Sequence, residues 1–305
     1  PTDSKGWVLL LDEPWPSLPI YPATFAANWG NRLPECKRAI REESQVATSW
    51  VNFGKALAAR EQYQEALTAL QRGLALEADN SQALREVGAV LLALAKPGEA
   101  LERLQESVDR NRHDPESLRL LGIAAIRANK AGAHAERLRA GLARFKSVVG
   151  LYQVIARTEC VLGRLPKAEE VLRAGLQQRS RSRELLLERA LVLSRSGDSA
   201  SALEELKAYT ELDLGSSFEP WVTRFRLRTL AQAGQHDPAL ELVQATFERE
   251  EGKEVRTLAL WGLLRALKGD PKAGALDVEK AQRARPSPEY LLLQGILRLK
   301  AGEKV

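Results

Sequence analysis

The chain has 305 residues, of which 44% are hydrophobic and 28% charged, and its net charge is +5. This apolar content can bury a helix–helix seam throughout, and no apolar run reaches the roughly 18 residues that a membrane span needs. Two cysteines and three histidines without ligand-like spacing predict no disulfide framework and no metal site, and we expect no cofactor because a glycine-rich phosphate loop is missing.

Residues 1–46 form an N-terminal extension, in which Pro14, Pro16, Pro19 and Pro22 alternate with apolar and aromatic residues. Proline removes a backbone donor and fixes φ, so we expect an extended arm here. A short helix is expected from Pro34 to Glu43, because apolar residues fall on one face. The chain opens on Pro1 without a basic-then-apolar leader, and we expect a processed or shortened start.

From residue 47 a period of 34 residues dominates the sequence. A small residue recurs at this spacing, a second small residue follows twelve positions later, and a leucine follows four positions after that. Such a period is typical of stacked helix pairs, in which close crossings require Gly or Ala and leucine fills the neighbouring gap. The three series are Gly54, Gly88, Gly122, Ala156 and Ala190; Ala66, Ala100, Ala168 and Ala202; and Leu70, Leu104, Leu138, Leu172 and Leu206.

The period predicts an all-α solenoid of antiparallel helix pairs over residues 47–305. We expect about seven repeats and a final single helix, at 47–80, 81–114, 115–148, 149–182, 183–216, 220–254, 255–285 and 288–302. Asn80, Asp114 and Ser287 stand where N-caps belong. His134 interrupts the series of second small residues, so looser helix packing is expected in the third repeat. Left-handed C-caps are expected at Gly163, Gly197, Gly234 and Gly269.

The first repeat contains a characteristic order of large, small and turn residues: Trp50, Phe53, Gly54, Leu57, Tyr63, Ala66, Leu70, Gly73 and Asn80. In this order it resembles the tetratricopeptide repeat. The match covers about residues 47–302 and weakens in the later repeats, where Leu227 and Gly274 replace expected residues. The resemblance implies a right-handed superhelix with a concave groove lined by the first helix of each pair, and it implies peptide or protein binding as the usual role.

Proteins of this kind line the groove with residues at set places in each first helix, and the resemblance implies that eight arginines stand there. They are Arg85, Arg119, Arg127, Arg157, Arg195, Arg224, Arg228 and Arg256. Because a guanidinium matches carboxylate and phosphate, an extended or acidic segment of another protein is the expected ligand. The alternative is that these arginines pair with nearby Glu on solvated helix faces.

Some chaperone-binding members of the family clamp a terminal carboxylate with Lys and Asn. Here Val51 and Lys55 stand at those two places, so we do not expect that clamp.

We therefore expect a non-catalytic adaptor and no enzyme, since no constellation of catalytic residues is present. The alternative is a nucleic-acid-binding repeat protein that uses the basic section 115–182, which holds 13 Lys/Arg and 5 Asp/Glu. Residues 183–254 instead hold 9 Lys/Arg and 14 Asp/Glu, so charge is distributed unevenly along the array. This uneven charge either steers an anionic partner to the basic section or reflects ion pairs between neighbouring repeats. Stacking aromatics in or near the groove are few, chiefly Trp221 and Phe225.

Both ends of the array are further candidates for interactions. The N-terminal arm, with Trp7 and Trp15, is expected to pack on the first repeat, and the alternative is a docking peptide that folds into the protein's own groove. At the other end Leu291, Leu292, Ile296 and Leu299 share a helix with no successor. Either more chain follows, or this face allows self-association, or the helix is a cap.

Overall fold

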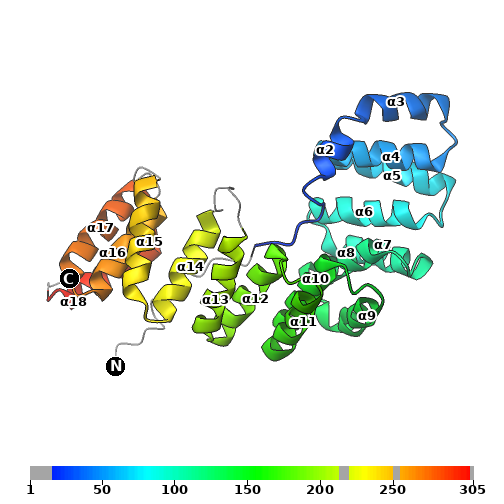
Figure 1. The fold of residues 1–305 in the computed structure, drawn as a ribbon. Helices are drawn as coiled ribbons and strands as arrows, with labels where there is room; N and C mark the ends of the chain where they lie inside the picture. The colour runs from blue at the N-terminus through cyan, green and yellow to red at the C-terminus, as the bar shows by residue number, and fades with distance from the viewer. Residues whose placement is uncertain (1–15, 213–219, 250–254, 303–305) are drawn as a thin grey trace. The chain divides into compact units, whose positions relative to one another are not determined.

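The computed structural model describes residues 16–212, 220–249 and 255–302, and all regular structure in these ranges is α-helical (Figure 1). The all-α solenoid predicted from the period is confirmed. The helices are α2 (Phe25–Gly30), α3 (Leu33–Glu42), α4 (Ala47–Ala58), α5 (Tyr63–Leu76), α6 (Ser81–Ala93), α7 (Pro97–Arg110), α8 (Pro115–Arg127), α9 (Ala131–Arg144), α10 (Val149–Val161), α11 (Leu165–Gln178), α12 (Arg183–Ser196), α13 (Ser199–Glu211), α14 (Pro220–Gln232), α15 (His236–Arg249), α16 (Val255–Leu267), α17 (Pro271–Ala284) and α18 (Pro288–Lys300).

The described residues form two compact parts, the N-terminal part at 16–192 and the C-terminal part at 193–302. Their boundary falls inside α12. From α3 to α11 and from α13 to α18, helices that follow one another in sequence pack against one another. The division between an extension at 1–46 and a repeat array at 47–305 stays a prediction.

The first helices of the five regular repeats begin 34 residues apart, and local sequence explains two of these starts. The Asn80 side chain accepts a hydrogen bond of 2.9 Å from the Ala83 N–H ahead of α6. Asp114 accepts one of 3.0 Å from the Glu116 N–H ahead of α8. Each cap satisfies a backbone donor that the helix itself leaves unpaired.

The turn inside each pair needs one residue with positive φ. Gly163 and Gly197 supply it in the fourth and fifth repeats, with φ of 73° and 88°, as expected for left-handed C-caps. In the first three repeats the same position holds Glu61, Ala95 and Asn129, with φ between 56° and 61°. The turn geometry is therefore kept even where the sequence lacks the glycine that signals it.

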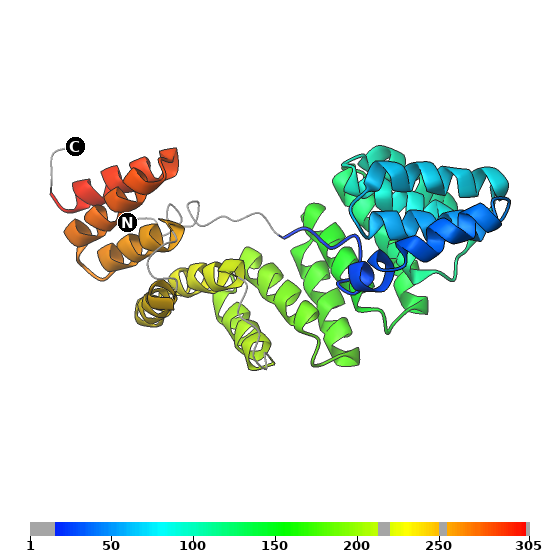
Figure 2. The ribbon, with the colours of Figure 1, turned by 90° about the horizontal axis from the view of Figure 1, so that it is seen from above.

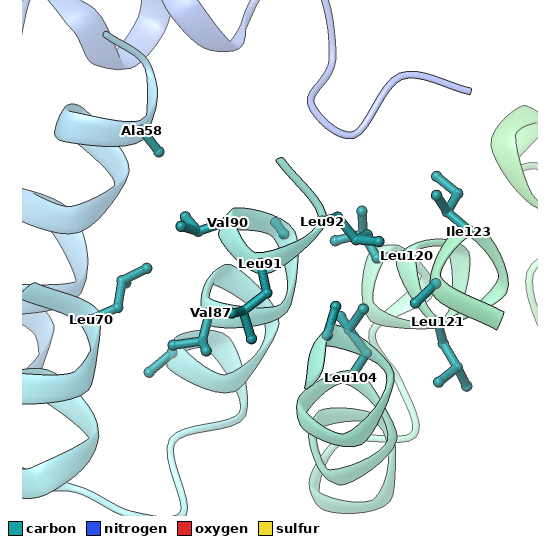
Figure 3. Close-up of a cluster of buried hydrophobic side chains, with 14 of the residues drawn as sticks. Ala58, Leu70, Val87, Val90, Leu91, Leu92, Leu104, Leu120, Leu121 and Ile123 are labelled. Atoms are coloured by element: carbon teal, nitrogen blue, oxygen red, sulfur yellow. The ribbon is translucent and has the colours of Figure 1, made fainter. Parts of the chain in front are cut away.

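Close helix crossings explain the small residues. A Cβ added at Gly88 of α6 would lie 2.4 Å from Leu104 Cγ of α7, and one at Gly54 would lie 2.6 Å from Leu70 Cγ. Both leucines are fully buried. Figure 3 shows Leu104 among neighbouring core side chains such as Leu121. In these two helix pairs the leucine occupies the space that the glycine leaves, so one small and one large residue together fill the crossing.

The third repeat differs from its neighbours at His134. The matching Ala66, Ala100 and Ala168 are fully buried, whereas His134 is half-buried. Helices α8 and α9 also contact one another less extensively than α4 and α5. The looser packing expected from the histidine is observed.

The N-terminal residues continue the helical stack only in part. Helix α3 packs on α4, and its buried Leu33 and Cys36 stand one period before Leu67 and Leu70 of α5. A first helix in this register would fall near residues 13–24, where the prolines prevent it. The chain at 16–22, called the arm below, instead has no regular secondary structure and bends at Ile20 and Tyr21.

Candidate functional site

The arm lies across the first helices of the N-terminal part. Arg119 of α8 donates from Nη1 to the Pro19 carbonyl and from Nη2 to the Ile20 carbonyl, each at 2.7 Å. Arg157 of α10 donates to the Pro16 carbonyl. In Figures 1 and 2 the arm accordingly leaves α2 and runs toward α10. The arm was expected to pack on the first repeat, with folding back over the protein's own first helices as the alternative. Its hydrogen bonds reach the third and fourth repeats, which agrees better with the alternative.

Apolar side chains hold the arm beside these polar contacts. Leu18 is 7% exposed and joins the buried cluster that contains Leu92 and Leu120. The Tyr21 ring stacks on Phe25, with ring centroids 4.1 Å apart and planes 12° apart. Leu18 is therefore part of the core, and the partly buried Ile20 and Tyr21 pack against it. Pro19 and Pro22 are exposed, and the arginines bind the carbonyls of Pro16, Pro19 and Ile20. Trp7 and Trp15 lie outside the described residues.

Burial of Tyr21 makes docking of the arm less favourable. Its hydroxyl is buried without a hydrogen-bond partner among the described residues. Burial, together with the nearby carboxylate of Glu86, raises the pKa of Tyr21 well above its ordinary value. A buried hydroxyl without a partner costs about 1–3 kcal/mol, so the docked arm carries an uncompensated penalty.

The guanidinium of Arg119 is held in place from its own helix. Glu116 accepts from Nε at 2.8 Å and from Nη2 at 2.6 Å. Gly150, at the start of α10, leaves room for the Arg119 side chain, since a Cβ at this position would lie 2.6 Å from Arg119 Cδ. Arg119 is only 9% exposed. Its donors are therefore fixed toward the arm before any ligand arrives.

Arg157 is fixed from the next repeat. Its Nε donates to both carboxylate oxygens of Glu188 on α12, at 3.0 and 3.1 Å, and Nη2 also pairs with this group. The Glu188 side chain is 4% exposed. An ion pair buried this deeply depends on both partners, because either charge alone would be left without compensation.

Two further predicted arginines lie in the N-terminal part and bind its own residues. Arg85 pairs with Glu86 at 2.8 Å and with Asp114 at 2.7 Å. Burial alone would lower the pKa of Arg85, but the two carboxylates outweigh it and raise the pKa. Arg127 donates to the Leu92 carbonyl at 3.3 Å, and burial lowers its pKa.

The remaining predicted arginines belong to the C-terminal part. Arg224 and Arg228 lie on α14 and Arg195 near the end of α12, all in the C-terminal part, and each has an interaction of its own. The side chain of Arg256 lies outside the described residues. The structure thus gathers Arg119 and Arg157 around the arm.

Carboxylates of the chain already balance the charge of this surface. Glu116 and Glu188 pair with the two arginines that touch the arm, and buried Glu86 pairs with Arg85. These carboxylates, with Gly150, are the site residues that sequence reasoning missed. Glu116 could have been found, since it stands three positions before Arg119 on the same helix.

The two residues at the positions of the chaperone-type clamp make contacts within the chain itself. Val51 is buried, and Lys55 Nζ lies 3.7 Å from the centroid of the Trp29 ring on α2. Burial lowers the pKa of Lys55. Lys55 thus holds α2 against α4 through a cation–π contact.

The described residues offer little to the nucleic-acid alternative. Phe225 is buried and Trp221 half-buried, so neither presents an open ring face for stacking. Across the described ranges no group of three or more His, Cys, Asp or Glu side chains could hold a metal ion. Within the same ranges, no helix has the length and apolar character to cross a bilayer.

The last helix shows an apolar surface. Leu291, Leu292 and Leu299 of α18 are 61%, 64% and 64% exposed, and Ile296 is partly exposed. The opposite side packs on α17 through buried Leu293 and Leu297.

Solved structures with the same fold support the repeat assignment. A tetratricopeptide repeat protein from Parabacteroides merdae aligns with a TM-score of 0.54 and 16% identity, over 90% of this chain and 96% of its own. PilF from Pseudomonas aeruginosa aligns with a TM-score of 0.53 and 14% identity, over 82% and 97%. The APC/C hetero-tetramer Cut9–Hcn1 aligns with a TM-score of 0.61 and 12% identity, over 90% of this chain and 53% of that chain. No protein-family model and no curated protein matches the sequence.

Proposed function

We propose that this protein, whose fold is that of tetratricopeptide-repeat proteins, is a non-catalytic adaptor that binds an extended segment of a partner protein. The binding surface is the groove formed by the first helices α4, α6, α8 and α10. Arg119 and Arg157 are the residues that hold the main chain of the bound segment.

One observation supports the proposal: the N-terminal arm of the chain is hydrogen-bonded to two of these first helices, α8 and α10. The arm contributes three main-chain acceptors, at Pro16, Pro19 and Ile20, and two arginines from successive repeats bind them. Main-chain recognition with apolar side chains in pockets is a general way to bind an extended peptide. The Cut9–Hcn1 structure is described as a hetero-tetramer, which is a precedent for protein partners on this fold.

A selection of twelve-residue peptides on the full-length protein tests the proposal. Selected peptides should lose binding to a groove variant with Arg119→Gln, Arg157→Gln and Glu188→Gln. The third change accompanies Arg157→Gln because it prevents an unpaired buried carboxylate. Binding is measured by calorimetry, and circular dichroism checks that the helix content is unchanged.

A matched control removes two arginines from second helices. Arg103 of α7 and Arg173 of α11 are largely exposed, and each pairs with a glutamate of its own helix. Arg103→Gln with Arg173→Gln should leave peptide binding unchanged. Peptides that bind the groove variant as tightly as the wild type would contradict the proposal.

Self-association through α18 is a second proposal, supported by the exposed leucines of that helix. A contiguous apolar surface of this kind is typical of interaction sites. Sedimentation should show an oligomer that Leu292→Glu dissociates, and a monomer at all concentrations would contradict this proposal.

A further inference from the structure

We infer that the arm is a built-in competitor for the groove, and that the partner segment it excludes is extended, proline-containing and free of acidic residues. The inference rests on the proposed function and concerns the chemistry and the regulation of the same site.

The backbone of the arm matches what the groove offers. The groove presents guanidinium donors, and the carbonyls of Pro16, Pro19 and Ile20 in the arm accept hydrogen bonds from them. Pro16 and Pro19 have no N–H, so the arm brings fewer donors that would need acceptors inside the groove. Proline also favours the extended conformation before binding, which lowers the entropy cost of docking. A partner segment with the same pattern would use the same contacts.

The charges beside the arm disfavour an acidic segment. Glu116 and Glu188 lie on the two arginines that touch the arm, and Glu86 is close enough to raise the pKa of Tyr21. A carboxylate placed at Leu18 would enter a buried apolar cluster, and one placed at Tyr21 would lie near Glu86. Burial and like-charge repulsion would both oppose it.

The docked arm is suited to displacement. Leu18 and Tyr21 anchor it, yet the Tyr21 hydroxyl is buried without a partner. An incoming segment with a phenylalanine at that place would make the apolar contact without the penalty. Because the arm is tethered, its effective concentration at the groove is high. Molecules with a docked arm cannot bind the partner, so the apparent affinity for the partner decreases as the fraction of docked molecules increases.

The test measures binding of a fluorescein-labelled peptide with the sequence of residues 14–24 to the full-length protein, by fluorescence anisotropy. Leu18→Asp with Tyr21→Asp should release the arm and bind the peptide at least tenfold more tightly than the wild type. Tyr21→Phe should tighten the arm and bind the peptide more weakly than the wild type. Adding Arg119→Gln to the released protein should abolish binding.

A second peptide tests the chemistry. The same sequence with Pro16→Asp and Pro19→Asp should not bind the released protein. Equal peptide affinity for the wild-type, released and Tyr21→Phe proteins would overturn the inference. Tighter binding of the acidic peptide would also overturn it. So would a released protein that keeps its helix content but binds neither peptide. If selected peptides of another chemistry still require Arg119 and Arg157, the proposed function stands and this inference fails.

Discussion

Arg119 Nη2 donates a hydrogen bond of 2.7 Å to the carbonyl of Ile20, which lies 99 residues earlier in the chain. The bond joins the third repeat to a segment that precedes the first. Under the proposed function a partner segment would use the same contact, because the acceptor is a main-chain atom that any extended peptide possesses.

The path of the Arg119 side chain depends on Gly150. Gly150→Ala would place a Cβ 2.6 Å from Arg119 Cδ, so the guanidinium should shift away from Pro19 and Ile20. We expect faster hydrogen exchange at the arm amides of Leu18 and Tyr21, with helix content unchanged. Gly98→Ala is the control, because a Cβ at Gly98 meets nothing within 4 Å. Equal exchange in both variants would show that Arg119 does not hold the arm.

The pair of Arg157 and Glu188 should show strong coupling. Arg157→Gln leaves a carboxylate that is 4% exposed without its partner, and the free energy of unfolding should fall by roughly 3–5 kcal/mol. Adding Glu188→Gln should recover most of that loss. A double-mutant cycle from urea denaturation measures the coupling, and simple additivity of the two changes would contradict the buried pair.

The contact between Gly88 and Leu104 should tolerate no extra atom. Gly88→Ala brings a Cβ within 2.4 Å of a leucine that is fully buried, and the expected destabilisation is about 1–3 kcal/mol. Denaturant unfolding measures it, again with Gly98→Ala as the control. If Leu104→Ala is introduced first, the cost of Gly88→Ala should become smaller, whereas an unchanged cost would exclude this contact as the cause.

His134 predicts a loss of stability in acid. Burial, with Arg137 and Lys130 nearby, lowers the pKa of His134 in the folded protein below its ordinary value. Its contribution is therefore fully present above the unfolded pKa of about 6.5 and declines as the pH falls toward the lower folded value. His134→Ala should remove this pH dependence in thermal melts between pH 8 and pH 5. The exposed His113 supplies the control, and His113→Ala should leave the dependence unchanged.

The sequence predicted the repeats well because a small residue and a leucine must recur wherever two helices cross. It did not signal the turns at Glu61, Ala95 and Asn129, since those residue types carry no left-handed preference comparable to glycine. The position of the arm was also beyond the sequence, because proline predicts an extended chain but not where it docks. Of the arginines, the register placed Arg119 and Arg157 on first helices. The i,i+3 spacing of Glu116 and Arg119 was readable from the sequence, whereas the pairing of Arg157 with Glu188, 31 residues away, became visible only in the fold.

Photo-crosslinking from the arm tests the central claim most directly. A benzophenone amino acid replaces Leu18 in the full-length protein, and the crosslinked peptides are mapped by mass spectrometry. An arm that occupies the groove predicts crosslinks within the same chain to α8 and α10, which the variant carrying Arg119→Gln, Arg157→Gln and Glu188→Gln should reduce. Crosslinks confined to α4 and α5, unaffected by that variant, would contradict the account.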